Sequence, residues 1–204
     1  TAVLSGSRKA LNWCDDKGNV DFYDMKGIVE GLLEAMQVSD YTMTRSQQPY
    51  LHPGKSCDIV VNGEVIGSFG EVHPVVQENF ELDQVTYVLE MAVEPLVASA
   101  TAVPQYKHLP KFPSMSRDIA VVVPAEVTNA ELEQVIRAHA GELLQGVRVF
   151  DIYTGKQVAA GCKSMAFNLT YQAADRTLTD AEVDASMKKV IAEVAEAYKA
   201  KLRD

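Results

Sequence analysis

Two neighbouring segments in the second half of the chain alternate bulky apolar residues with small or polar ones, and this period constrains the fold most. The first segment is V-R-V-F-D-I-Y-T-G (147–155) and the second is K-S-M-A-F-N-L-T-Y (163–171), with a short glycine-containing connection between them. A two-residue period is typical of strands with one buried face. The pattern therefore predicts two adjacent strands that turn one face toward a core.

The two faces of this predicted pair differ in chemistry. We expect the bulky residues to face the core: Val147, Val149, Phe150 and Ile152, then Met165, Phe167, Leu169 and Tyr171. The other face would carry Asp151 and Tyr153 from the first strand, and Ser164, Ala166, Asn168 and Thr170 from the second. The sequence thus predicts a small polar platform that contains one aromatic ring.

The elements around the pair follow a βαββαβ order. Residues 117–123 alternate as a strand, and two capping-box patterns, Thr128 with Glu131 and Thr179 with Glu182, mark the starts of two helices. The final K-A-K-L-R is consistent with a short edge strand. This order predicts a ferredoxin-like sandwich, with both helices on one sheet face and the other face free to bind a partner such as RNA.

The first half predicts a mixed antiparallel sheet with at least two helices. Asp21 is a suitable N-cap for an apolar stripe at helical spacing. Asn62-Gly63 joins the alternating segments 57–61 and 64–69, and it is a strong hairpin signal because a type I′ turn needs positive φ at both central residues. Further elements are expected at 41–45 and 86–93 as strands and after Pro74 as a short helix.

Chain length and a proline-bracketed segment without periodicity indicate two domains in an α+β chain. The chain has 204 residues with an apolar share of 47%, which is ordinary for globular domains. Residues 98–109 lack a sustained period and are bracketed by prolines. We therefore expect a first module at 1–97, a linker at 98–109 and a second domain at 110–204.

The sequence offers no membrane or disulfide signal. No apolar run approaches the roughly 18 to 20 residues that cross a bilayer, and the first residues lack a signal-peptide pattern. Three widely spaced cysteines, Cys14, Cys57 and Cys162, suit free thiols in a reducing compartment. These features predict a soluble, cytoplasmic protein with no membrane partner.

Charge is spread unevenly along the chain. The formal net charge is -9, and Thr1 to Leu109 holds 7 of the 19 basic residues but 15 of the 28 acidic ones. RNA binding by the nearly balanced second half would need a local basic patch. Candidates beside the predicted strands are Lys156, Lys163, Arg176 and Arg117, each equally compatible with a solvated charge.

Two details qualify these basic candidates. Arg117 shares strand parity with core residues, so it could instead pair with Asp118 or a helix end. The remaining lysines near the C-terminal end are expected to be solvated on the side away from RNA: Lys188, Lys189, Lys199 and Lys201.

Catalytic and metal sites are not indicated. His52 and His73 each precede a proline, but no Ser or Cys nucleophile motif and no H-x-x-x-H spacing accompanies them. We expect turn and capping roles for both. An ATP site needs cations for the phosphates, and the first half offers only the arginines Arg8 and Arg45. The sequence therefore predicts a chain without catalytic residues or metal ligands.

Blocks in both halves carry a family resemblance. K-F-P-S-M-S-R-D-I-A-V-V-V, V-F-D-I-Y-T-G, G-C-K-S-M-A-F-N-L-T-Y and D-R-T-L-T-D-A-E-V resemble the ferredoxin-fold anticodon-binding domain of bacterial phenylalanyl-tRNA synthetase beta subunits. In the first half, D-F-Y-D-M-K-G-I-V-E-G-L-L, L-H-P-G-K and I-G-S-F-G-E-V-H-P are similar to the catalytic-like module that precedes it. The resemblance covers essentially the whole chain and implies the C-terminal part of a longer subunit.

This resemblance implies specific roles. The first half would be a partial class II synthetase-like module without chemistry, which scaffolds an alpha subunit in an alpha2-beta2 assembly. ATP and Mg2+ would be used by that alpha subunit, and this fragment would bind no cofactor. The second half would bind the anticodon of tRNA-Phe through Asp151, Tyr153 and Ser164, with Tyr153 stacking on a base for about 1 to 3 kcal/mol.

Two alternatives remain open from the residues alone. One is a free-standing RRM-like module that binds RNA or protein, and the other is an independent class II ligase domain. Loss of tRNA binding in platform variants would favour the anticodon reader over the first alternative. ATP-pyrophosphate exchange by the chain alone would favour the second.

Overall fold

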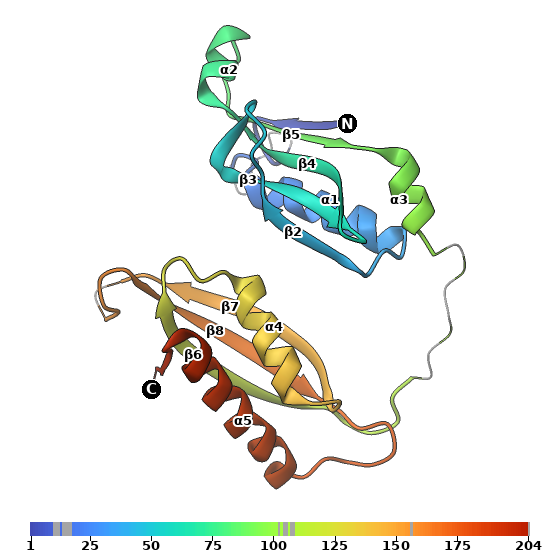
Figure 1. Ribbon diagram of the computed structural model, residues 1–204, viewed down its shortest axis with the longest axis vertical. Helices are drawn as coiled ribbons and strands as arrows, with labels where there is room; N and C mark the ends of the chain where they lie inside the picture. The colour runs from blue at the N-terminus through green and yellow to red at the C-terminus, as the bar shows by residue number, and fades with distance from the viewer. Residues whose placement is uncertain are drawn as a thin grey trace. The chain divides into compact units, whose positions relative to one another are not determined.

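The computed structural model describes residues 1–9, 13, 18–101, 103, 106, 109–155 and 157–203. The chain divides into two compact units, Thr1–Tyr106 and Lys107–Asp204, and each packs helices against an antiparallel sheet (Figure 1). The α+β prediction is therefore confirmed. Cys57 and Cys162 are free thiols, whereas Cys14 lies outside the described residues.

The first unit is built on a five-stranded sheet. Its strands are β1 (Ala2–Ser5), β2 (Tyr41–Arg45), β3 (Leu51–Val61), β4 (Glu64–Val72) and β5 (Thr86–Met91), in the spatial order β1-β5-β4-β3-β2. Neighbouring strands run antiparallel throughout. Asn62 and Gly63 between β3 and β4 have φ values of 52° and 80°, which confirms the predicted hairpin turn.

Three helices complete the first unit: α1 (Phe22–Ala35), α2 (Pro74–Asn79) and α3 (Val93–Ser99). Asp21 caps α1 in a capping box with Asp24, as its position predicts. The buried face of α1 shares a core with strand residues such as Phe69. The sequence pattern did not predict α3, and the predicted linker begins within it, because α3 has one buried residue, Leu96, and hence no periodic apolar face.

The second unit has the predicted βαββαβ order. Its elements are β6 (Met115–Pro124), α4 (Asn129–Ala140), β7 (Leu144–Tyr153), β8 (Cys162–Tyr171), α5 (Asp180–Tyr198) and β9 (Lys201–Leu202). The spatial strand order is β7-β8-β6-β9, with every pair antiparallel. This topology confirms the ferredoxin-like sandwich.

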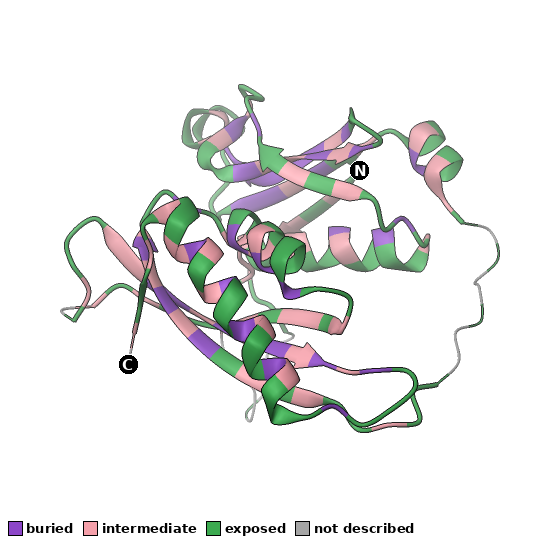
Figure 2. Ribbon diagram, turned by 60° about the horizontal axis from the view of Figure 1, so that its bottom comes forward, coloured by how far each residue is buried: buried purple, intermediate pink, exposed green. Residues whose placement is uncertain are grey.

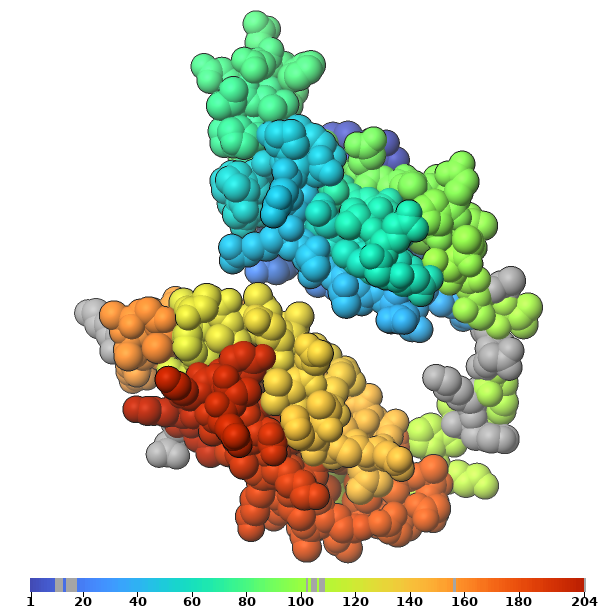
Figure 3. Space-filling view, viewed as in Figure 1, coloured from blue at the N-terminus to red at the C-terminus, as the bar shows by residue number. Residues whose placement is uncertain are grey.

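Both helices of the second unit cover the same face of its sheet. In Figure 3 the atoms of α4 (yellow) and α5 (red) cover the side of this unit that faces the viewer. Their buried residues include Leu132, Ile136, Val183 and Val190, which pack on strand residues such as Phe167 in one core. Figure 2 shows buried and exposed stretches alternating along the helices of this unit. Among the described residues of this unit, no helix packs on the opposite sheet face, which we call the open face.

The two helices begin at the predicted capping boxes. Thr128 and Thr179 each accept a hydrogen bond from the backbone N–H three residues later, that of Glu131 and of Glu182. The Thr128 hydroxyl donates to the Glu131 carboxylate and lowers its pKa, while the Thr179 backbone N–H lowers the pKa of Glu182. The bonds of both capping boxes therefore favour the ionised form of the glutamate.

The helices that the structure describes include no candidate membrane span. None of them combines the length and apolar content needed to cross a bilayer.

Candidate nucleic-acid interface

The register of β7 and β8 places the predicted polar residues together. Asp151 lies opposite Ala166, and Tyr153 lies opposite Ser164. Because directly paired residues point to the same side of a sheet, these residues share one face. The partners of buried Phe167 and Leu169 are Val149 and Val147, so the core lies on the other side. The polar platform is thus on the open face.

A β-bulge separates the two halves of β7 and corrects part of the predicted core face. The register shifts between Val149 and Asp151, so Phe150 is an extra residue without its own cross-strand partner. Phe150 and Ile152 are each 53% exposed and do not belong to the core as predicted. Ile152 does pair with buried Met165, but β7 is an edge strand, so no further strand covers its outer side. The bulge also brings Asp151 and Tyr153 onto the open face.

Hydrogen bonds order the middle of the open face. The Asn168 amide donates to the Asp118 carboxylate at 2.6 Å, and the Thr170 hydroxyl donates to Asn168 at 3.4 Å. Arg148 lies opposite Asn168 on β7. This row carries both signs of charge across the strands β7, β8 and β6.

Tyr153 lies close to the start of the loop that follows β7. A Cβ atom at Gly155 would overlap the phenol of Tyr153, so the side chain folds back over the glycine backbone. Gly155 permits this close approach, whereas a side chain there would force the Tyr153 ring to move. The ring is half-buried, which leaves part of it accessible to a ligand.

Ser164 lies on the open face, as predicted. It is buried, however, whereas the predicted contact with RNA had assumed an exposed side chain. Only 3% of it is accessible, and its cross-strand neighbours are Tyr153 and Val122. A residue on a central strand has side chains on both flanks, and these shield a short hydroxyl. Contact of Ser164 with a ligand would therefore require its neighbours to move.

The predicted basic residues that the structure describes do not gather around the platform. Arg117 lies opposite core residue Leu169, and its guanidinium pairs with Asp180 and, at 3.5 Å, with Asp184 of α5. The hydrogen bond to Asp180 raises the pKa of Arg117. Arg117 is therefore on the helix-covered face, paired at a helix end as the alternative interpretation stated.

Two of the other three candidates, Arg176 and Lys163, also lie away from the platform. Arg176 follows the far end of β8 and pairs with Glu182 at the start of α5. Lys163 lies opposite buried Val123, and its charge contributes to lowering the pKa of Glu131 on the helix side. Lys156 lies outside the described residues.

Among the described residues, three cations that were not predicted for the platform lie on the open face. They are Arg148 on β7, Lys201 on β9 and Arg203 after it. Lys201 lies opposite Val122, an open-face residue, so its expected placement away from the platform is wrong. The alternation around Leu202 in the final K-L-R contained this signal, because a strand with Leu202 inward turns its neighbours outward.

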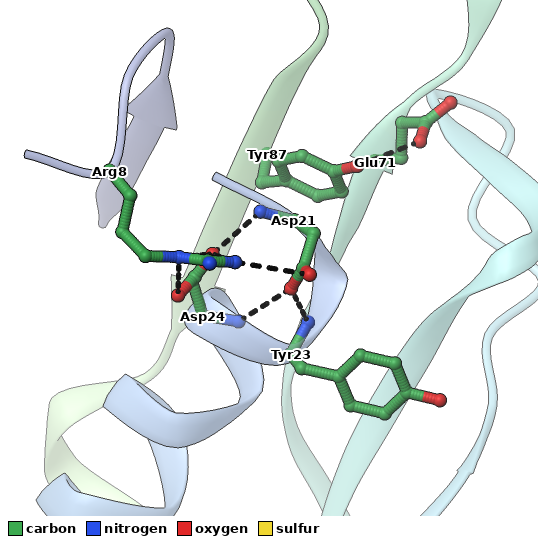
Figure 4. A network of polar contacts seen from close by, with 6 residues as sticks. All are labelled: Arg8, Asp21, Tyr23, Asp24, Glu71 and Tyr87. Carbon is green, nitrogen blue, oxygen red and sulfur yellow. Dashed lines mark hydrogen bonds and ion pairs between the residues drawn. The ribbon is translucent and has the colours of Figure 1, made fainter. Parts of the chain in front are cut away.

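Polar networks in the first unit serve its helix ends and sheet. Figure 4 shows the Arg8 guanidinium between Asp21 and Asp24, with distances of 3.2 Å and 2.9 Å. The hydrogen bond from Arg8 lowers the pKa of Asp24. The buried Glu71 carboxylate accepts from the Tyr87 hydroxyl at 3.1 Å; burial, aided by this bond, raises the pKa of Tyr87 to about 12.

The two histidines of the first unit have the expected local roles. His52 Nδ1 accepts from the Gly54 backbone N–H at 3.0 Å, and His73 caps α2 by accepting from Val75. Within the described ranges, no group of three or more His, Cys, Asp or Glu residues is arranged to hold a metal ion.

Comparisons with known proteins match both units. Residues 1–93 match the family model of the phenylalanyl tRNA synthetase beta chain CLM domain, and residues 110–203 match that of the ferredoxin-fold anticodon binding domain. The phenylalanine–tRNA ligase beta subunit of Bacillus subtilis is 42% identical over 203 residues, 99% of this chain and 25% of that protein. The Symbiobacterium thermophilum subunit is 42% identical over 98% of this chain and 22% of its own length. The chain thus spans about a quarter of the length of these relatives.

Proposed function

Because the chain belongs to the phenylalanine–tRNA ligase beta subunit family, we propose that its second unit binds the anticodon of tRNA-Phe and its first unit supports a catalytic alpha subunit. Neither unit would carry out the aminoacylation chemistry. The free-standing RRM-like module is the less favoured alternative, because both family models match in order along one chain.

The observation that carries this proposal is the open face of the second unit. A four-stranded sheet with helices on one side only, and with an aromatic ring among polar groups on the other, matches the platforms on which single-stranded RNA bases stack. Anticodon bases are unpaired in a free loop, so they can be splayed onto such a surface. Tyr153 and Asp151 come from the same stretch of β7, directly after the bulge.

Each platform residue has a defined chemical role in this proposal. Tyr153 stacks on a base, and the Asp151 carboxylate accepts from the amino and imino groups of a guanine edge. Ser164 lies opposite Tyr153 and is buried, so it acts by supporting the ring unless RNA displaces the covering groups. Specificity would come from Asp151, because stacking alone tolerates every base.

Two observations support the assembly role that we propose for the first unit. Its Arg8 is held by two carboxylates at the start of α1, so this cation is not available to neutralise ATP phosphates. In this proposal ATP and Mg2+ bind in the alpha subunit, within an alpha2-beta2 enzyme in the cytoplasm. Exposed apolar residues such as Phe80 (74%) and Val93 (63%) are suited to contact with another protein.

A titration with RNA tests the anticodon assignment. The 204-residue chain is titrated with a short hairpin that carries the tRNA-Phe anticodon loop, at low salt. Tyr153→Ala and Asp151→Ala should each weaken binding by about tenfold, the equivalent of 1.4 kcal/mol. The matched controls are Tyr23→Ala in the first unit and Asp175→Ala beyond the far end of β8, and neither should change the affinity.

Other outcomes would redirect the proposal. Unchanged affinity in both platform variants would remove the anticodon assignment. Equal affinity for hairpins with unrelated loops would favour a general RNA-binding module. Measurable ATP-pyrophosphate exchange by this chain alone would contradict the non-catalytic role.

A further inference from the structure

Arg203 and Tyr153 meet on the open face although they come from opposite edges of the sheet. The Arg203 guanidinium carbon lies 4.7 Å from the centroid of the Tyr153 ring, within the range of a cation–π contact. One guanidinium N–H donates to the side-chain oxygen of Gln157 at 3.1 Å, in the loop that follows β7. The Arg203 backbone N–H donates to the Ala120 carbonyl at 2.9 Å, which anchors the residue beside β6.

Small residues make this long reach possible. The strand order is β7-β8-β6-β9, so the two side chains must cross the space above β8 and β6. Ala120 and Ala166 are paired on those strands, on the open face, and lie between the two edges. Larger side chains at these positions would occupy the path of the guanidinium.

The charge of the open face depends on the C-terminal edge strand. Among the described residues of β6, β7 and β8 on this face, Asp118 and Asp151 are acidic and Arg148 is basic, which leaves one negative charge in excess. Lys201 on β9 and Arg203 after it add two positive charges. These two residues therefore decide whether the platform repels or attracts a phosphate backbone.

We propose that Arg203 is a positioning and RNA-contacting residue of the open face: its guanidinium holds the Tyr153 ring in place and presents its remaining N–H groups to a phosphate of the bound loop. The inference rests on the proposed anticodon binding and adds a residue from a different element to it. A planar guanidinium combines both roles because it stacks on an aromatic ring through its face and donates through its edge. Lys201 adds positive charge but makes no ring contact.

The first test uses the same hairpin titration at several salt concentrations. Arg203→Ala should weaken binding by about tenfold and make the slope of log K against log salt shallower by about 0.7, the value for one lost phosphate contact on a single strand. Arg203→Lys should keep the slope but recover only part of the affinity, because an ammonium lacks the planar ring contact. Lys188→Ala on the exposed side of α5 removes the same charge and should change neither quantity.

A double-mutant cycle tests the coupling to Tyr153. If Arg203 positions the ring, Arg203→Ala should cost less in a Tyr153→Ala background than in the wild-type chain. In the free protein, Arg203→Ala should also shift the NMR resonances of the Tyr153 ring, whereas Lys188→Ala should not. This second measurement does not require RNA.

The outcomes separate this inference from the proposed function. If Tyr153→Ala and Asp151→Ala weaken binding but Arg203→Ala behaves like Lys188→Ala, the anticodon assignment stands and the role of Arg203 is wrong. If the platform variants have no effect on RNA binding, the assignment itself fails. Additive losses in the cycle, with unchanged Tyr153 resonances, would reject the positioning role.

Discussion

The two faces of the four-stranded sheet in the second unit differ in what surrounds their cations. On the helix-covered face, Arg117 pairs with two aspartates of α5. On the open face, Arg203 contacts an aromatic ring and a neutral amide. The difference shows that closeness to a strand does not decide which partners a cation has. Strand parity and the presence of helix carboxylates decide it.

The largest expected effect is a difference in stability between substitutions on the two faces of β8. Phe167 is fully buried on the helix side of β8, so Phe167→Ala should destabilise the second unit by about 3 to 5 kcal/mol. Thr170→Ala on the open face of the same strand should cost less than about 1 kcal/mol. Urea unfolding, monitored by hydrogen exchange of peptides from β8, measures the change in unfolding free energy for both variants. Similar losses for the two variants would contradict the assignment of the faces.

Gly155→Ala should act on the open face without unfolding the unit. The added Cβ overlaps the Tyr153 phenol, so the ring must leave its position. Hairpin affinity should fall by about tenfold, or about 1.4 kcal/mol, while the free energy of unfolding changes by less than about 1 kcal/mol. Gly146→Ala is the matched control, since a Cβ there meets only Thr170 at 4.0 Å. If Gly155→Ala binds the hairpin as tightly as Gly146→Ala and the wild-type chain, the position of the Tyr153 ring does not matter for RNA binding.

Removing a helix cap should have the opposite effect to Gly155→Ala: it should lower the stability and leave RNA affinity unchanged. Thr179→Ala removes the cap of α5 and should lower the free energy of unfolding by about 1 kcal/mol. Hairpin affinity should stay unchanged, because the cap belongs to the helix-covered side. Chemical denaturation and the RNA titration together check this prediction. A loss of affinity without a loss of stability would place the N-terminus of α5 in the interface.

The smallest expected effect is the pH dependence of stability that the capping boxes of α4 and α5 contribute. The pKa values of Glu131 and Glu182 are lowered in the folded state by the threonine caps, so their contribution is fully present above the unfolded glutamate pKa of about 4.3. It is lost as the pH falls through the lowered folded values. Urea midpoints measured from pH 6 to pH 3 should therefore fall less in Glu131→Gln and Glu182→Gln than in the wild type. An identical acid slope in all three proteins would show that the caps do not titrate.

Local signals in the sequence predicted much of the fold. The capping boxes at Thr128 and Thr179 and the Asn62-Gly63 turn each depend on residues a few positions apart, and the structure confirms all three. The shared face of Asp151 and Tyr153 was also predicted, and the register confirms it. These features are readable because neighbours along the chain make the contacts that define them.

Features that depend on distant residues were misread. A period of two cannot show a bulge, so Phe150 was assigned to the core although it is exposed. Burial of Ser164 depends on strands β7 and β6 on its two sides. For Arg117 the sequence left pairing with a helix end open, but it could not identify Asp180 and Asp184, because these partners lie more than 60 residues away in sequence.

The sequence by itself determined the order of elements, the ends of the capped helices and the residues available for the polar platform, because propensity, capping and alternation act over short distances. Only the tertiary structure decided which cations belong to that platform. It placed Arg117 among helix carboxylates and brought Arg203 across two strands to Tyr153. Charge pairing and ring contacts depend on which segments the sheet brings together, and that arrangement is a property of the whole folded unit.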